Sequence, residues 1–202
     1  MIVFAAVVEP TLRRQENSVV LYDSERLTRI SENWFQESYW RTEDKVVGEA
    51  SGRGSVVFVR HEDHNWVLRH YHRGGFVGRF IRDRYLWLGI EQTRAFREWR
   101  LLSELSERNL PVPAPIAARV RRFGVSYTAD LITGYLSNTR SFESILDDGD
   151  ACLEQWEIIG RTLRRFHDQG VNHPDLNVRN ILVDGEKRVY LIDFDKGEIR
   201  GA

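Results

Sequence analysis

The chain has 202 residues, of which 42% are hydrophobic and 29% charged, a composition that is typical of a globular protein and excludes an intrinsically disordered one. A formal net charge of −1 excludes a global bias toward nucleic acid or membrane surfaces, so any such bias must be local. The one cysteine, Cys152, excludes an internal disulfide framework and a cysteine-based zinc site.

No apolar run approaches the roughly 20 residues that span a bilayer. The apolar residues 1–8 are too short for a secretory signal and lack its basic start. We therefore expect the protein to stay in the compartment where it is made.

The first 45 residues predict short elements without recognisable chemistry. An irregular opening contains one expected strand, at residues 18–22, and a short helix is expected at 31–39. Trp34, Phe35 and Trp40 lie on the apolar side of that helix, which favours packing into a core over a binding role.

Residues 45–71 predict three strands in succession, separated by a glycine-rich loop and a polar turn. These strands are rich in β-branched and aromatic residues and are expected at 46–47, 55–60 and 66–71. In the loop GEASGRGS at 48–55, Gly48, Gly52 and Gly54 allow the backbone to approach phosphate oxygens and to offer N–H donors. Glycine-rich hairpins are common, so an ordinary turn is an equal alternative on these residues alone.

Arginines and aromatic residues are concentrated between Arg69 and Arg100. Eight arginines stand against three acidic residues, which gives a local charge of about +5. Aromatic residues are interleaved with them, among them Tyr71, Phe76, Phe80, Tyr85 and Trp87. This density favours contact with an anionic partner over a solvated helix face. Both nucleic acid and an anionic lipid surface fit these residues.

Residues 91–105 predict a helix that ends near residue 109. Its apolar residues recur at the helical spacing: Ala95, Trp99, Leu102 and Leu105. Glu98 lies on another side, where it either reaches Arg69 or remains at the surface. The three prolines of LPVPAPIAARV, at 110–120, predict an extended connector.

Two more strands, at 118–122 and 125–133, are followed by two helices. Ser141 is expected to cap the first helix, at 142–146, and Gly170 to end the second, at 153–168. The expected buried stripe of the second helix consists of Trp156, Ile159, Leu163 and Phe166.

The stretch HPDLNVRNILVDGEKRVYLIDFD, at 173–195, gathers oxygen-bearing side chains around an expected hairpin. Asp175 and Asn180 precede its first strand and Asp193 ends its second, with an Asp-Gly turn signal between the strands. Carboxylate and amide oxygens suit Mg²⁺. An aspartate upstream can accept a proton from an attacking hydroxyl, which completes the D-x-x-x-x-N and D-F-x layout of kinase phosphoryl transfer. We expect His173 to brace this loop and not to shuttle protons.

Several motifs together resemble the protein-kinase-like fold and, more narrowly, the lipopolysaccharide core kinases that act on 3-deoxy-D-manno-octulosonic acid (Kdo). The residues that carry the resemblance are GEASGRGS at 48–55, LRHYHRGG at 68–75, DRY at 83–85, LPVPAPIAAR at 110–119, HPDLNVRNIL at 173–182 and LIDFDK at 191–196. The resemblance runs from about residue 35 to the C-terminus. Arg69 stands where protein kinases carry a lysine, and an arginine can grip phosphate in a bidentate way.

The resemblance implies an α+β, two-lobed domain over residues 1–202. Its small lobe, at about 31–133, would hold an antiparallel sheet and one helix, and its large lobe, at 134–202, would be mainly helical and shortened. Relatives of this kind carry further helical sequence, whereas nine residues follow Asp193 here. Activity of this chain is therefore an expectation to be measured.

The resemblance also implies ATP and Mg²⁺ as cofactors and phosphorylation of the 4-hydroxyl of Kdo on a Kdo-lipid A precursor. Asp175 would be the catalytic base, and Asn180 and Asp193 the metal ligands. The residues expected on the nucleotide side are Gly48, Gly52, Gly54, Arg69, Glu98, Ile132 and Thr133, the last two through hinge backbone groups. The protein would be peripheral at the cytoplasmic face of the inner membrane, without nucleic acid or an obligate protein partner.

Two alternatives remain open from the sequence. One is another kinase of the same fold, such as a heptose kinase, an aminoglycoside phosphotransferase or a small protein kinase. No activation-loop segment follows Asp193, which disfavours protein substrates. The other is a non-catalytic, anionic-lipid-binding pseudokinase. The intact set of Asp175, Asn180 and Asp193 argues against it, because binding alone does not require all three.

Overall fold

The computed structural model describes residues 8–50, 56–71 and 84–201, which form two compact units. The sheet unit comprises the described parts of Val7–Arg100 together with Ala114–Tyr135. The C-terminal unit comprises Leu101–Pro113 and the described part of Leu136–Ala202. Among the described residues the chain passes between the units after Arg100, Pro113 and Tyr135, whereas the sequence predicted a single boundary after residue 133.

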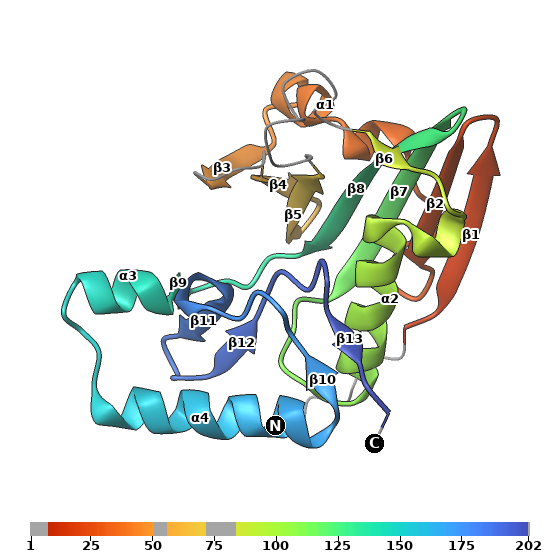
Figure 1. The fold of residues 1–202 in the computed structure, drawn as a ribbon. Helices are drawn as coiled ribbons and strands as arrows, with labels where there is room; N and C mark the ends of the chain where they lie inside the picture. The colour runs from red at the N-terminus through yellow and green to blue at the C-terminus, as the bar shows by residue number, and fades with distance from the viewer. Residues whose placement is uncertain (1–7, 51–55, 72–83, 202) are drawn as a thin grey trace. The chain divides into compact units, whose positions relative to one another are not determined.

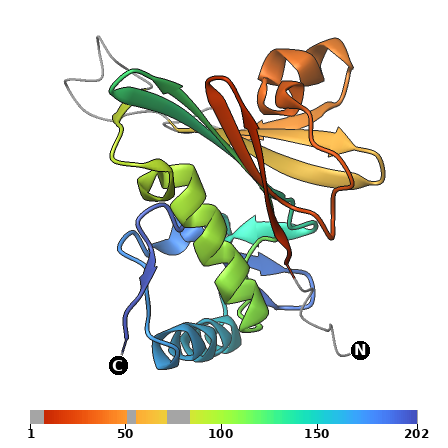
Figure 2. The same cartoon turned by 90° about the vertical axis from the view of Figure 1, so that its right-hand side faces the viewer.

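The sheet unit is built on antiparallel strands (Figures 1 and 2). In spatial order the described strands are β1 (Pro10–Gln15), β2 (Ser18–Asp23), β7 (Pro115–Phe123), β8 (Ser126–Gly134), β5 (His64–His70), β4 (Val56–His61) and β3 (Val46–Ala50). The short β6 (Tyr85–Leu86) pairs with β8 beyond the end of β5. The predicted strands at 18–22, 55–60, 66–71 and 125–133 are confirmed within a residue or two, and β1 was not predicted.

The predicted proline connector is only partly correct. Residues 110–114 are outside regular structure, but β7 begins at Pro115. A proline at the first position of a strand is tolerated because its missing N–H is not needed there. The ladder shifts by one residue between Pro115 and Ala117, which accommodates the start of the strand.

The predicted helix at 31–39 is two shorter elements. A 3₁₀ turn, η1 (Glu32–Phe35), is followed by α1 (Glu37–Thr42), because Gln36 between them has an extended backbone. Trp34, Phe35 and Trp40 are buried, as predicted. They pack in one core with residues of β4 and β5 such as Val59 and Trp66.

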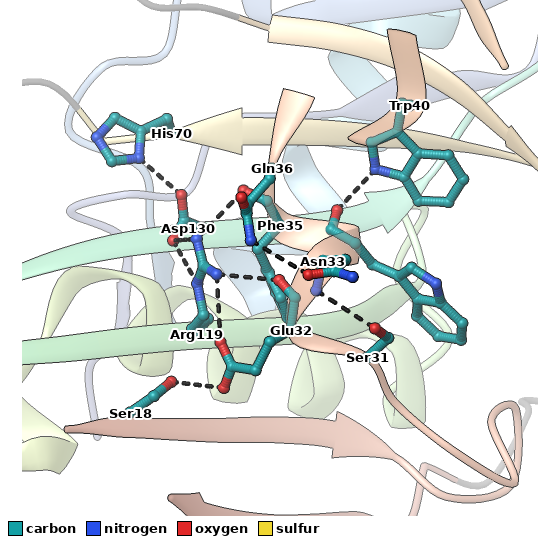
Figure 3. Close-up of polar contacts among 11 residues, drawn as sticks. Ser18, Ser31, Glu32, Asn33, Phe35, Gln36, Trp40, His70, Arg119 and Asp130 are labelled. Carbon is teal, nitrogen blue, oxygen red and sulfur yellow. Dashed lines mark hydrogen bonds and ion pairs between the residues drawn. The ribbon is translucent and has the colours of Figure 1, made fainter. Parts of the chain in front are cut away.

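A buried polar network ties η1 to the sheet (Figure 3). Arg119 on β7 and Asp130 on β8 are each 2% exposed and lie opposite each other in the ladder. Arg119 Nε donates to Asp130 Oδ2 at 2.9 Å, and its terminal nitrogens donate to the carbonyl oxygens of Glu32 at 3.0 Å and Phe35 at 3.2 Å. His70 Nδ1 lies 2.6 Å from Asp130 Oδ1. The Arg119 guanidinium therefore donates hydrogen bonds to two backbone carbonyl groups of η1. A short 3₁₀ turn leaves such groups without partners of its own.

The helix predicted at 91–105 begins later than expected. A 3₁₀ turn, η3 (Ile90–Gln92), and an extended Thr93 precede α2 (Arg94–Glu107). The predicted apolar stripe is confirmed, since these residues are at most 2% exposed: Ala95, Trp99, Leu102 and Leu105.

The C-terminal unit contains two further helices, α3 (Phe142–Asp147) and α4 (Leu153–Asp168). Ser141 caps α3, since its Oγ accepts from the Ser144 N–H at 3.2 Å. Gly170 follows α4 with φ of +73°, the left-handed conformation of a helix C′ residue. Both predictions are confirmed, but Trp156 is 49% exposed and not part of a buried stripe.

Short strands complete the C-terminal unit. β11 (Ile181–Asp184) pairs antiparallel with β12 (Val189–Leu191) and with β9 (Thr139–Ser141), so the predicted hairpin is confirmed. β10 (Val171–Asn172) pairs with β13 (Glu198–Ile199). A 3₁₀ turn, η4 (Val178–Asn180), leads directly into β11.

Candidate active site

The loop before η4 holds Asp175 by its backbone and leaves its carboxylate exposed. The Asp175 carbonyl oxygen accepts the side-chain amides of Asn177 at 2.8 Å and Asn180 at 2.9 Å. Among the described residues, no hydrogen bond or ion pair occupies the Asp175 carboxylate. A fixed backbone with an open carboxylate is the arrangement that a general base requires.

Asn180 links this loop to the segment that carries Asp193. It is 8% exposed and lies at the end of η4. Its carbonyl oxygen accepts the Ile192 N–H at 3.0 Å, which sets the residue before Asp193 beside Asn180. The structure therefore brings the predicted Asp175, Asn180 and Asp193 positions together within one unit.

Asp193 has a left-handed backbone, with φ of +64°. Aspartate tolerates this region better than most residues, but the conformation still needs support from its surroundings. That support comes from both neighbours. The Ile192 N–H is bonded to Asn180, and Phe194 is 1% exposed, with its ring stacked 6.1 Å from that of Phe166 on α4.

His173 braces the same segment, as predicted. Its Nε2 lies 3.0 Å from the Ile192 carbonyl oxygen, so Nε2 carries the proton and donates. Its ring lies 4.6 Å from that of Phe194. The histidine therefore contacts the residue on each side of Asp193, the backbone of Ile192 and the ring of Phe194.

Binding of Mg²⁺ would depend on the donor atoms that these residues offer. The described residues contain no group of three or more His, Cys, Asp or Glu side chains gathered as metal ligands. The predicted pair instead offers a carboxylate from Asp193 and an amide oxygen from Asn180. Because the Asn180 amide nitrogen faces the Asp175 carbonyl, its oxygen is turned away from that bond. Two oxygen ligands fit an ion that takes its remaining ligands from phosphates and water.

In the sheet unit, Arg69 on β5 forms an ion pair with Glu98 on α2. The Glu98 side chain is 3% exposed and that of Arg69 is 21% exposed, so the open choice between a paired and a surface glutamate is answered in favour of the pair. The Tyr71 hydroxyl donates to Glu98 Oε2 at 2.5 Å and accepts from Arg69 at 2.9 Å. Tyr71 was not recognised from the sequence as part of this site. Its position two residues after Arg69 on the same strand face was the available signal.

Burial is the main cause that raises the pKa of the Tyr71 phenol well above its ordinary value. The charge of Glu98 adds to this effect, and that of Arg69 opposes it. The phenol therefore keeps its proton and donates a hydrogen bond to the Glu98 carboxylate. The three groups form one closed arrangement that fixes the guanidinium of Arg69.

The nucleotide-binding roles of the glycine and hinge residues stay predictions, but Gly48 was expected in a loop and lies in a strand. Gly48 lies within β3, next to a register shift, and an added Cβ would be 3.1 Å from Phe58 Cδ2. Gly48 therefore belongs to the strand, and its contact with phosphate stays a prediction. Gly52 and Gly54 lie outside the described residues. Ile132 and Thr133 lie inside β8 between β5 and β7, and their contact with an adenine stays a prediction.

Residues 37–202 match the model of the Lipopolysaccharide kinase (Kdo/WaaP) family. The chain belongs to this family. It is similar to proteins named 3-deoxy-D-manno-octulosonic acid kinase, including one from Vibrio parahaemolyticus serotype O3:K6 that is 42% identical over 91% of this chain and 77% of the relative.

Two further relatives carry the same name. The protein from Haemophilus influenzae strain 86-028NP is 39% identical over 91% of this chain and 79% of its own. The protein from Vibrio cholerae serotype O1 is 44% identical over 78% of this chain and 67% of its own. As a lipopolysaccharide kinase, the chain is a phosphotransferase that uses ATP and acts on a hydroxyl group. No helix among its described residues is long and apolar enough to cross a membrane.

Proposed function

We propose that this lipopolysaccharide kinase transfers the γ-phosphoryl group of ATP to the 4-hydroxyl of Kdo on a Kdo-lipid A precursor. The observation that carries the proposal is the loop geometry. One asparagine, Asn180, holds the Asp175 backbone with its side chain and the Asp193 segment with its own backbone. The names of the relatives support Kdo as the acceptor sugar.

Each residue has a defined role in this proposal. The Asp175 carboxylate orients the sugar hydroxyl and takes its proton as the oxygen attacks. Asn180 and Asp193 would hold Mg²⁺, which supplies positive charge to the phosphate oxygens when bound. Arg69, fixed by Glu98 and Tyr71, binds phosphate oxygens of the nucleotide in the place of the usual lysine.

The location follows from the acceptor. A Kdo-lipid A precursor is held in a bilayer by its acyl chains, so the sugar hydroxyl is presented at a membrane surface. We therefore place the enzyme at the cytoplasmic face of the inner membrane as a peripheral protein. No nucleic acid and no obligate protein partner is part of the proposal.

The test is phosphate transfer from radiolabelled ATP to purified Kdo-lipid A precursor, with lipid A precursor lacking Kdo as the acceptor control. Asp175→Asn should lower turnover by roughly 10²–10⁴-fold, the contribution of a positioned base. ATP binding measured by calorimetry should change little. Asp168→Asn is a matched control on the exposed surface of the same unit.

Undiminished turnover of Asp175→Asn would remove the base assignment. Transfer to the acceptor lacking Kdo would refute the acceptor while leaving the kinase assignment in place. A wild-type chain that binds no nucleotide in the presence of Mg²⁺ would favour the non-catalytic reading.

A further inference from the structure

One end of the sheet unit gathers large apolar side chains at the surface. Leu86 and Leu88 are 66% and 72% exposed, and Phe123 and Val125 are 41% and 76% exposed. Single exposed hydrophobic residues are ordinary on a protein surface. Here, however, four of the ten strongly exposed large hydrophobic side chains of the described residues fall in two three-residue stretches. This concentration favours a binding role for these side chains.

The two stretches lie side by side. β6 pairs with β8, so that Leu86 lies opposite Ser126, and Phe123 on β7 lies opposite the same Ser126 from the other side. The Trp87 N–H then donates to the Val125 carbonyl oxygen at 2.9 Å. Figures 1 and 2 show β6 beside the end of the β7–β8 hairpin. We refer to Leu86, Leu88, Phe123 and Val125 as the hairpin-end patch.

Two exposed arginines border the hairpin-end patch. The Arg84 guanidinium lies 4.9 Å from the centroid of the Phe123 ring, and that of Arg122 lies 4.9 Å from the Trp87 ring. Within the described residues neither arginine forms an ion pair. The adjacent β1–β2 turn contributes one acidic residue, Glu16. Two cations thus remain available beside the apolar side chains.

Arg84 belongs to the segment between Arg69 and Arg100 that the sequence emphasised, whereas Arg122 lies outside it. Of the segment between Arg69 and Arg100, Arg69 is held by Glu98, Arg94 donates to the Tyr85 hydroxyl at 2.6 Å, and Arg100 pairs with Glu91 at 2.6 Å. Their charges are engaged within the sheet unit. The surface cations beside the patch are Arg84, which comes from the same segment, and Arg122, which comes from β7.

We propose that the hairpin-end patch, with Arg84 and Arg122, docks this kinase on an anionic phospholipid surface. The leucine, valine and phenylalanine side chains would enter the boundary between lipid headgroups and acyl chains, a region that aromatic rings also favour. The guanidinium groups would bind lipid phosphates. A lipid surface fits better than a protein partner, because four side chains at one end of a sheet are a small area beside the roughly 800 Å² per partner of a stable protein interface.

This inference rests on the proposed function, because the lipid-linked acceptor is what makes docking on a membrane useful. A lipid-linked acceptor keeps the reacting hydroxyl at the bilayer, and an enzyme that docks there meets it at high local concentration. Lipid binding itself does not depend on the acceptor being Kdo, so the two proposals can fail separately.

The experiment uses the full chain and sedimentation with vesicles of phosphatidylcholine, with and without phosphatidylglycerol. The wild type should bind the anionic vesicles, and the double variant Leu88→Asp, Val125→Asp should lose binding. Leu153→Asp is the matched control, since Leu153 is 76% exposed on α4 and lies outside the patch. It should bind as the wild type does.

A second pair of changes tests the charge. Arg84→Gln combined with Arg122→Gln should weaken binding to anionic vesicles roughly 30-fold, since each basic side chain near such a surface contributes about fivefold. Binding to vesicles without phosphatidylglycerol should change much less. Circular dichroism and urea unfolding check that each variant folds.

The outcomes separate the two proposals. Variants that lose vesicle binding should still phosphorylate a delipidated, water-soluble Kdo oligosaccharide at the wild-type rate. A wild type that does not bind anionic vesicles, or an apolar double variant that binds like the wild type, would overturn the docking surface. Light scattering that shows a dimer abolished by the double variant would assign the patch to a second copy of the chain instead. Vesicle binding without any transfer to either acceptor would overturn the proposed function alone.

Discussion

Removing one oxygen atom from Tyr71 tests the closed arrangement with Arg69 and Glu98. In Tyr71→Phe the ring remains, but Glu98 loses a 2.5 Å hydrogen bond while it stays 3% exposed. A hydrogen bond to a charged group contributes about 1.5–3 kcal/mol, and a carboxylate this buried cannot recover it from water. We expect the free energy of unfolding to fall by about 2 kcal/mol.

Urea denaturation measures this loss. With a slope of about 2 kcal/mol per molar urea, the midpoint should fall by about 1 M. Tyr39→Phe is the control, because the half-buried Tyr39 makes no hydrogen bond through its hydroxyl among the described residues of the same unit. It should change the free energy of unfolding by less than about 0.5 kcal/mol. Equal midpoints for the two variants would refute the reasoning and leave Arg69 as the sole stabilising partner of Glu98.

The free energy of unfolding of Tyr71→Phe should also depend on pH differently from that of the wild type. In the unfolded chain the Tyr71 phenol ionises near pH 10, as tyrosine ordinarily does, whereas burial raises its pKa well above that value in the folded chain. Above about pH 10 the folded state therefore binds more protons than the unfolded state, and stability falls as the pH rises. The stability difference between wild type and Tyr71→Phe should be constant below about pH 9 and narrow above about pH 10. A difference that widens there would contradict the raised pKa.

Two further predictions concern folding. Gly170→Ala should destabilise the chain more than Gly149→Ala by at least about 1 kcal/mol in thermal unfolding. Both glycines have φ of +73°, but only at Gly170 would the new Cβ collide with a backbone oxygen, that of Arg200. Asp130→Ala leaves the buried Arg119 with only the partly exposed Glu32 carboxylate as an ion-pair partner and should cost about 3–5 kcal/mol in urea unfolding. Equal effects of the two glycine changes, or a loss below about 1 kcal/mol for Asp130→Ala, would contradict these readings.

Elements with local signals were predicted well from the sequence. The limits of α4 at Leu153 and Asp168 were predicted to the residue, because its periodicity and the following Gly170 are both local signals. The β11–β12 hairpin was predicted from its Asp-Gly turn. In contrast, β1 has no alternating pattern, since nearly all of its residues are exposed, and only its pairing with β2 defines it.

The site was predicted in part for a similar reason. The motif around Asp175 and Asn180 lies within six residues and can be read locally. The Tyr71 bond to Glu98 joins residues 27 apart, and its geometry depends on how α2 packs against β5. Gly48 was assigned to a loop because the register shift that keeps it in β3 is set by the partner strand and not by its own sequence.

The network around Arg119 has a consequence for where this chain can be cut. The family match begins at residue 37, yet β2 pairs with β7 and the Glu32 and Phe35 carbonyls receive the Arg119 guanidinium. A chain trimmed to the limits of the family match would present β7 as an open edge, ready to pair with another molecule, and would leave a buried cation with fewer acceptors. The residues before the family match thus cover the edge of β7 and oppose aggregation through that edge.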